Sequence, residues 1–218
     1  MSKNVISNSV IRRLPRYYRF LGELEENGYI RISSRELAEK MGLTASQIRQ
    51  DFNCFGEFGQ QGYGYNVSEL RRQIGFILGF DRQTPMILMG AGNLGKAIAT
   101  HINFSNKGFE LIGIFDVKPS IIGKKLGKIV VSDISELKDF CMENKPEVAA
   151  LCVPQEVAEK EVNRLIDCGI HAFWNFTHYD LTISHENVIV ENVHLGDSLT
   201  ILSYAMNSAK KEKRNEST

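Results

Sequence analysis

The chain of 218 residues is long enough for one large domain or two small ones, and its 43% hydrophobic and 24% charged residues are ordinary for a globular protein. No apolar stretch has membrane-spanning length and no secretory signal opens the chain, so we expect a cytoplasmic protein without a membrane partner. The four cysteines and five histidines show no metal-ligand spacing, which predicts reduced thiols and no metal site.

The net charge of zero is unevenly distributed along the chain. Residues 1–83 hold 12 Lys/Arg against 9 Asp/Glu, a balance of +3, whereas residues 84–204 hold 10 against 15, a balance of −5. A mildly basic segment followed by an acidic one suggests that the first segment has a polyanionic partner.

Three helices are predicted in the basic segment. Apolar residues at helical spacing predict a helix over residues 7–27. Two capping boxes, at residues 33–36 and 44–47, begin two short helices, and Gly42 turns the chain between them. The second of these short helices is expected to end near Cys54.

Two short helices joined by a glycine turn are typical of a helix-turn-helix motif, whose second helix lies in the major groove of DNA. The glycine- and tyrosine-rich residues 58–65 then resemble a hairpin wing that can enter the minor groove, and a helix over residues 67–80 closes the module. A helical hairpin with a merely solvated polar face is the alternative. The predicted DNA-contacting residues are Arg13, Arg16, Thr44, Ser46, Gln47, Arg49, Gln50, Gln61, Gly62 and Tyr63.

A short apolar strand at residues 85–89 leads into a Gly-x-Gly-x-x-Gly loop and then a helix. Gly90 permits the tight turn, Gly92 lets the backbone approach a pyrophosphate, and Gly95 allows close packing of helix on strand. The N–H groups and the positive dipole end of the helix then hold phosphates. This pattern predicts a dinucleotide site at Gly90, Ala91, Gly92, Asn93, Leu94 and Gly95.

Asp116 ends the next apolar strand, 21 positions past Gly95. A carboxylate there can accept hydrogen bonds from both hydroxyls of an adenosine ribose and would repel a 2′-phosphate. NADH or NAD⁺ is therefore the expected cofactor. A glycine-rich turn in a flavodoxin-like domain, or one that binds another nucleotide such as CoA, is the alternative.

The alternation of strands and helices continues, with strands expected at residues 128–131, 148–153, 172–176 and 187–190, and this predicts a parallel sheet with right-handed crossovers. Ligands bind at the carboxyl ends of such strands, which adds four cofactor-binding candidates: Val153, Pro154, Asn175 and Phe176. The last helix, residues 197–206, is apolar on most sides, and a partner subunit is an economical cover for it.

Two other classes of protein share part of this pattern. A small NAD(H)-dependent oxidoreductase would use the same loop, but the only other module has DNA-binding features. No Tyr-x-x-x-Lys pair and no nucleophile–base pattern around a histidine occurs, so no catalytic residue is predicted. A CoA-binding regulator built on the same fold is the other alternative.

Eight short motifs are spread from Ile11 to Met206: Arg13-Leu14-Pro15-x-Tyr17, Ser46-x-x-x-Arg49-x-Asp51, Gly62-x-Gly64-Tyr65, Gly90–Gly95, Phe115-Asp116, Val153-Pro154, Asn175-Phe176 and Glu191-Asn192-Val193. In their types and order they resemble the Rex family of bacterial repressors. The resemblance implies a homodimer with exchanged terminal helices. It also implies binding to an inverted-repeat operator and release when NADH binds, so that the NADH/NAD⁺ ratio is sensed.

Two features depart from the family pattern. Relatives often carry an acidic residue after Glu-Asn-Val and a tyrosine in the first Rossmann helix, which together engage an arginine of helix one. Here those positions are His194 and His101, and Arg19 is kept, so an altered switch contact between domains is implied. The wing residue before Gly62, often basic in relatives, is Gln61.

The expected fold is α/β with four parts. A winged helix-turn-helix domain covers residues 1–83, and an NAD-type Rossmann domain covers residues 84–195. A dimerisation helix, expected to be domain-swapped, covers residues 196–210, and a charged tail covers residues 211–218.

Overall fold

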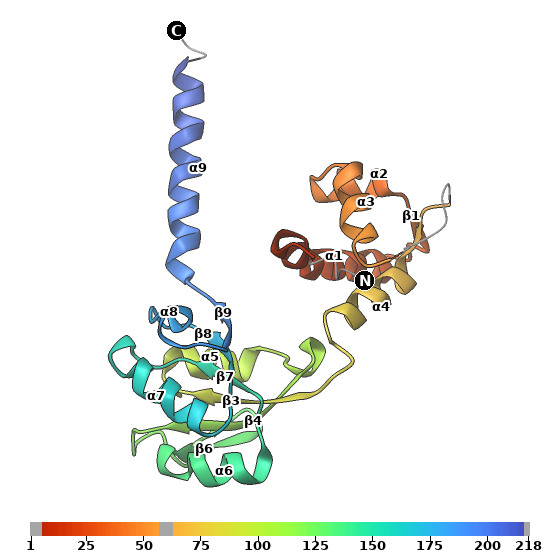
Figure 1. The fold of residues 1–218 in the computed structure, drawn as a ribbon. Coiled ribbons are helices and arrows are strands. Elements are labelled where there is room, and N and C mark those ends of the chain that lie inside the picture. Colours follow the sequence, from red (N-terminus) through yellow and green to blue (C-terminus); the bar gives the residue numbers. More distant parts are fainter. Residues whose placement is uncertain (1–5, 57–62, 216–218) are drawn as a thin grey trace. The chain divides into compact units, whose positions relative to one another are not determined.

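The computed structural model describes residues 6–56 and 63–215, with side chains up to residue 210 (Figure 1). The chain divides into two compact units. The first consists of the residues up to 82 together with residues 106–108, and the second consists of residues 83–105 and of the residues from 109 onwards.

The first unit is a winged-helix arrangement of four helices and a two-stranded antiparallel sheet. Its elements are α1 (Asn8–Glu26), β1 (Arg31–Ile32), α2 (Ser34–Met41), α3 (Ala45–Asn53), β2 (Tyr65–Asn66) and α4 (Val67–Ile77). Helix α1 packs on α4, and α2 packs on α3. Their apolar faces meet in one core that includes Leu14, Leu21, Ile48, Phe52 and Ile74.

The predicted capping boxes differ in outcome. Ser33 and Glu36 bond reciprocally to each other's backbone amides, so the first box is confirmed. Thr44 caps α3 by accepting the amide of Gln47 at 3.1 Å. The Gln47 side chain instead donates to Asp51 at 2.8 Å, so the prediction of a second reciprocal box is wrong. The buried carboxylate of Asp51 is a strong acceptor for Gln47 Nε2, and this bond directs the side chain along the helix instead of back to the amide of Thr44.

The strand pairing beside the predicted wing brings in a segment that the sequence pattern did not indicate. Ile32 pairs with Tyr65, and Arg31 pairs with Asn66. The paired segment β1 comes between α1 and α2 in the chain. A two-residue strand is too short to leave a visible alternation in sequence. Residues 57–62, which include the predicted DNA contacts Gln61 and Gly62, lie outside the described residues.

The second unit contains a seven-stranded sheet in the order β5-β6-β4-β3-β7-β8-β9. Its strands are β3 (Thr84–Met89), β4 (Phe109–Asp116), β5 (Lys125–Leu126), β6 (Ile129–Asp133), β7 (Val148–Leu151), β8 (Ala172–Asn175) and β9 (Ile189–Asn192). All neighbouring pairs are parallel except β5–β6, so the predicted parallel sheet is confirmed and gains one antiparallel edge strand. The six parallel strands have the order of dinucleotide-binding doubly wound sheets.

Helices cover both faces of this sheet. They are α5 (Asn93–His101), α6 (Leu137–Asn144), α7 (Gln155–Asp167) and α8 (Leu181–Ser184), with short 3₁₀ turns at Ser105–Lys107 and Ile134–Glu136. Successive residues of β3 alternate between the faces: Ile87 and Met89 pack with α6 and α7, whereas Met86 and Leu88 pack with α5. The strand order reverses at β3, so a crevice is expected at the carboxyl ends of β3 and β7.

The last helix, α9 (Leu195–Asn215), is one uninterrupted helix (Figure 1). It continues well past residue 206, because lysine, arginine, glutamate and alanine are favourable helix formers. Its large apolar side chains are exposed, for example Leu199 at 68% and Tyr204 at 75%. A folded chain does not leave such a surface uncovered without a reason.

Candidate functional sites

The three glycines of the loop after β3 differ in how strictly the structure requires a glycine. Gly90 has a φ of +92°, and a Cβ atom there would lie 2.5 Å from the carbonyl oxygen of Cys152. At Gly95 a Cβ atom would lie 1.9 Å from the carbonyl oxygen of Gly90, so only glycine lets α5 pack this closely. At Gly92 the φ is −67°, and a Cβ atom would meet nothing within 4 Å.

Gly92 is therefore not required by the turn or by the packing. It is the N-cap of α5, and it offers no side chain to the amide groups of the first helical turn. A helix N-terminus with free N–H groups and open space in front of it fits a phosphate group. These features fit the pyrophosphate of a dinucleotide, as the sequence predicts, with Asn93 and Leu94 exposed at the start of the helix.

Asp116 has a second role that the sequence pattern did not indicate. Its side chain is buried at the end of β4, where Oδ2 accepts the amide of Ala91 at 2.7 Å and Oδ1 accepts the amide of Lys118 at 2.8 Å. The carboxylate thus holds the glycine loop in place. Each oxygen keeps one further lone-pair position, so ribose hydroxyl groups can still bind there.

The ends of β7 and β8 provide the remaining predicted contacts. Val153 lies beside Gly90, since its Cγ1 would be 3.2 Å from a Cβ atom there, and Pro154 is exposed. Phe176 is half-buried, with its ring 4.6 Å from that of Trp174 in an edge-on contact. These side chains form an apolar border at the carboxyl ends of the strands.

Asn175 is placed differently from its prediction as a cofactor ligand. Its Nδ2 donates to the carbonyl of Tyr179 and to Oδ1 of Asn192, while its Oδ1 accepts from the amide and the hydroxyl of Thr177. A side-chain amide has two donors and two acceptor positions, and all four are used. The buried Asn175 side chain therefore positions the loop after β8 and has no capacity left for a ligand.

The predicted DNA-contacting residues of the first unit separate into an exposed set and a bonded set. Ser46, Arg49 and Gln50 are exposed along one face of α3, and Arg49 reaches Ser34 Oγ at 3.1 Å. Tyr63 is also exposed. Arg16 donates to the carbonyl of Met41 at 2.5 Å, which ties α1 to the end of α2.

The bonded set surrounds Asp51, a residue that the sequence motif contained but that no pattern singled out. Its side chain is 0% exposed and accepts two hydrogen bonds from Arg13, at 2.6 and 2.7 Å. Tyr17 Oη at 2.7 Å and Gln47 Nε2 at 2.8 Å complete the network. The signal available in the sequence was an aspartate close to the inward-facing apolar positions of an amphipathic helix, because an aspartate buried there needs a partner.

The electrostatics of this network favour an ionised Asp51. Burial alone would raise its pKa, but the hydrogen bonds from Arg13, Tyr17 and Gln47 outweigh burial and hold the pKa below its ordinary value. The same contact raises the pKa of Arg13. Arg13 and Tyr17 thus fix α1 against α3, whereas the bond from Gln47 lies within α3. Only the remaining polar atoms of Arg13 and Gln47 are available for DNA.

The predicted switch residues lie in both units. Arg19 is exposed in the first unit and His101 is exposed in the second. His194 is half-buried, and its ring stacks on that of His178 with centroids 5.4 Å apart. Its Nδ1 is buried and has no hydrogen-bond partner among the residues that the structure describes. A contact among Arg19, His101 and His194 stays a prediction.

A winged helix-turn-helix unit joined to a Rossmann unit with an open glycine cradle defines a nucleotide-binding transcription regulator. Two family models agree with this division. Residues 5–53 match the family described as "Putative DNA-binding protein N-terminus", and residues 81–179 match the family described as "CoA binding domain".

Curated relatives and solved structures cover almost the whole chain. The chain is 51% identical to the redox-sensing transcriptional repressor Rex of Thermoanaerobacter sp. (strain X514), over 97% of this chain and 94% of the relative. It is 52% identical to that of Clostridium perfringens (strain SM101 / Type A), over 94% and 96%. The chain therefore belongs to the Rex family of redox-sensing transcriptional repressors.

Two of the similar structures contain ligands. RSP in complex with β-NAD⁺ and operator DNA is 50% identical, with a TM-score of 0.88 and coverage of 99% of both chains. RSP in complex with β-NADH is 48% identical, with a TM-score of 0.87 and coverage of 97% of this chain and 99% of that chain. A further RSP structure is described as a Rex-family repressor.

Neither a membrane span nor a metal cluster is found where the structure describes the chain. Within residues 6–56 and 63–215, no helix is long and apolar enough to cross a bilayer. Over the same residues, no group of three or more His, Cys, Asp or Glu side chains is placed to hold a metal ion.

Proposed function

We propose that this chain is a homodimeric transcriptional repressor that binds an inverted-repeat operator and leaves it when NADH binds. The open space at Gly92, in front of an uncapped helix N-terminus, is the observation that carries the cofactor assignment. The exposed face of α3 supports the DNA partner. RSP, which is about half identical to this chain, has been solved with each of these ligands.

The chain has to distinguish NADH from NAD⁺ at the nicotinamide end, because the two cofactors share the adenosine and the pyrophosphate. The apolar border formed by Val153, Pro154 and Phe176 favours an uncharged ring, since removing a cation from water is costly. The form of the protein that releases DNA therefore binds NADH more tightly than NAD⁺. Gly90–Gly95 and Asp116 contribute equally to both cofactors.

NADH can shift the DNA-binding units only by binding one arrangement of the dimer better than the other. Couplings of about 1–3 kcal/mol correspond to roughly 5–150-fold weaker operator binding. Linkage requires operator DNA to weaken NADH binding by the same factor.

Fluorescence anisotropy of a labelled inverted-repeat operator tests this function directly. NADH should displace the protein, NAD⁺ should do so far less, and CoA should have no effect at the same concentration. Equal responses to NADH and NAD⁺ would exclude a redox sensor. Displacement by CoA alone would favour the CoA-binding alternative. Turnover of an alcohol or aldehyde without DNA binding would favour the oxidoreductase.

Asp116→Ala should weaken NADH binding by about 1–3 kcal/mol, because ribose hydroxyl groups lose their acceptor. The variant also loses the two bonds to Ala91 and Lys118, so a lower affinity alone does not prove ribose contact. The decisive measurement is the preference for NADH over NADPH by calorimetry. This preference should be strong in the unmodified protein and weaker in the variant. Equal affinities of the unmodified protein for NADH and NADPH would refute the assignment.

The exposed apolar surface of α9 supports its role as the dimerisation helix, exchanged between subunits. Ending the chain before Gly196 should cause loss of the dimer or aggregation, measured by light scattering. Removal of residues 211–218 alone is the matched control and should leave the dimer intact. A well-behaved dimer of the chain that ends before Gly196 would contradict the proposal.

We also propose that the protein acts in the cytoplasm, where a DNA-binding repressor meets its operator, and that it has no catalytic role. We propose the domain boundaries that the sequence predicts, at residues 83, 195 and 210.

A further inference from the structure

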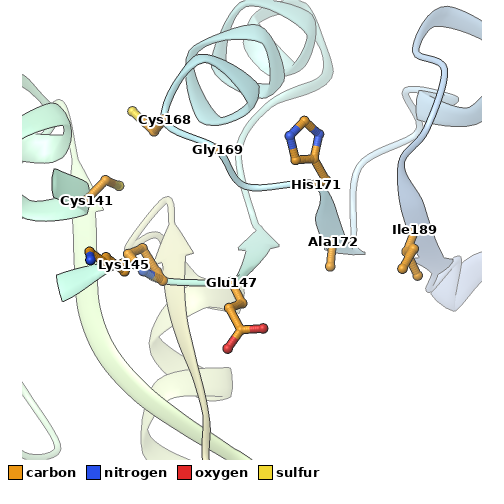
Figure 2. Close-up of a pocket in the computed structure, with 9 residues that line it drawn as sticks. Cys141, Lys145, Glu147, Cys168, Gly169, His171, Ala172 and Ile189 are labelled. Atoms are coloured by element: carbon orange, nitrogen blue, oxygen red, sulfur yellow. The ribbon is translucent and has the colours of Figure 1, made fainter.

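A pocket lies in the Rossmann unit at the amino ends of three strands (Figure 2). Glu147, His171 and Ile189 line it near the amino ends of β7, β8 and β9, whereas the glycine loop follows the carboxyl end of β3. Its volume is about 390 Å³. The proposed cofactor site does not use it.

Two free cysteines from different helices meet at this pocket. Cys141 lies on α6 and is buried, and Cys168 follows the last residue of α7 and is half-exposed. Both pack in the core on the same face of the sheet, and both line the pocket. The influence of Cys168 on the pKa of Cys141 agrees with this placement of the two side chains at one pocket.

The environments of the two thiols differ in a way that suits two different roles. Burial, followed by the charge of Cys168, raises the pKa of Cys141 to about 12, so Cys141 remains a protonated thiol. Cys168 is the thiol that solvent reaches. Lys145 and His171 line the same pocket.

We propose that Cys141 and Cys168 form a modification site, an oxidant-sensitive thiol pair that closes to an intramolecular disulfide in the presence of a peroxide. The Cys168 thiolate attacks one peroxide oxygen, the O–O bond breaks, and the leaving oxygen departs as water after protonation. The Cys141 sulfur then attacks the resulting sulfenic acid, forms the S–S bond and releases water with its own proton. Two thiols are oxidised, and one hydrogen peroxide is reduced to two waters.

The disulfide would enclose β7 between its two half-cystines, since that strand lies between α6 and α7 in the chain. Val153 and Pro154, which follow the other end of β7, belong to the proposed cofactor site. The thiol pair therefore gives the Rossmann unit a second oxidative input, and its chemistry does not depend on the dinucleotide.

Hydrogen peroxide treatment of the full-length protein, followed by thiol titration and non-reducing peptide mapping, tests the proposal. Two of the four thiols should disappear, and one linked peptide should join Cys141 to Cys168, with reversal by dithiothreitol. Cys168→Ser should abolish the link. Cys54→Ser and Cys152→Ser are matched controls and should leave it unchanged.

Three outcomes would overturn the proposal. One is survival of all four thiols at a peroxide concentration that oxidises free N-acetylcysteine. Another is a loss of thiols that arises only from disulfide-linked dimers formed through the exposed Cys54. The third is unchanged formation of an intramolecular disulfide in Cys168→Ser. None of these readouts involves NADH or DNA, so they are independent of the proposed function.

Discussion

Asp51→Ala should unfold the winged-helix unit at temperatures at which the Rossmann unit remains folded. The substitution leaves the buried Tyr17 hydroxyl and the Arg13 guanidinium without their acceptor. Breaking a buried ion pair costs about 3–5 kcal/mol, and the lower end applies because the Arg13 side chain is 26% exposed and can be partly hydrated. That is a large share of the roughly 5–15 kcal/mol that stabilises a typical domain. Differential scanning calorimetry should show the first transition moving to a lower temperature.

Arg49→Ala is the matched control on the same helix. Arg49 is exposed and bonds only to Ser34 in the described residues, so its loss should leave both transitions in place. Operator affinity should nevertheless fall by about 1–3 kcal/mol if Arg49 contacts a guanine. A normal first transition in Asp51→Ala would show that the network does not stabilise the unit.

Acidification should reproduce the effect of Asp51→Ala. The pKa of Asp51 is lower in the folded protein than its ordinary value, so its contribution to stability is complete above the ordinary aspartate pKa of about 3.9. The contribution is lost as the pH falls through the lower, folded-state pKa. The first transition of Asp51→Asn should therefore depend less on pH in the acidic range.

Gly92→Ala should abolish most NADH binding while leaving the Rossmann unit as stable as before. Apart from its chain neighbours, a Cβ atom at Gly92 has no atom of the described residues within 4 Å, and alanine adopts the φ of −67° freely. Alanine is a poorer N-cap than glycine, but it also restricts the unfolded chain, and the two effects are of similar size, each about 0.5–1 kcal/mol. The methyl group does occupy the space in front of the helix N-terminus, so we expect at least a roughly tenfold weaker NADH complex, or about 1.4 kcal/mol.

Gly95→Ala should have the opposite primary effect. Its methyl group would lie 1.9 Å from the carbonyl oxygen of Gly90, and backbone has to move to relieve that contact. Overpacking costs about 1–3 kcal/mol, and a backbone clash belongs at the upper end. Thermal unfolding and NADH titration of both variants separate the roles. Normal NADH affinity in Gly92→Ala would show that the pyrophosphate does not lie at this position.

Sequence patterns predicted the elements whose cause is local. The glycine loop, the alternation of strands and helices, and the capping box at Ser33 are each determined by residues close together in the chain. The parallel pairing of the strands followed from the alternation of strands and helices. Contacts between distant segments were not predictable in this way, and they include the pairing of Ile32 with Tyr65 and the placement of Cys141 and Cys168 at one pocket.

The predicted site residues show the same limit. Arg13 and Gln47 are polar residues on helices that were expected to face DNA, but Asp51, far from Arg13 in sequence, determines where their side chains point. Asn175 was selected for its place at the end of a strand, but its amide bonds to Thr177 and Asn192 inside the protein. Position in a fold is readable from sequence, whereas the partner of a polar side chain depends on tertiary contacts.

The Asp51 network also restricts how the operator preference of such a protein can evolve. Exchange of Arg13 removes a bond that attaches α1 to α3, and exchange of Gln47 removes a bond that holds the Asp51 carboxylate in place. Ser46, Arg49 and Gln50 have no comparable buried partner among the described residues, so they can mutate at little cost to folding. Divergence toward new operators should therefore accumulate at these three positions, while the residues that anchor the helix remain the same across lineages with different target genes.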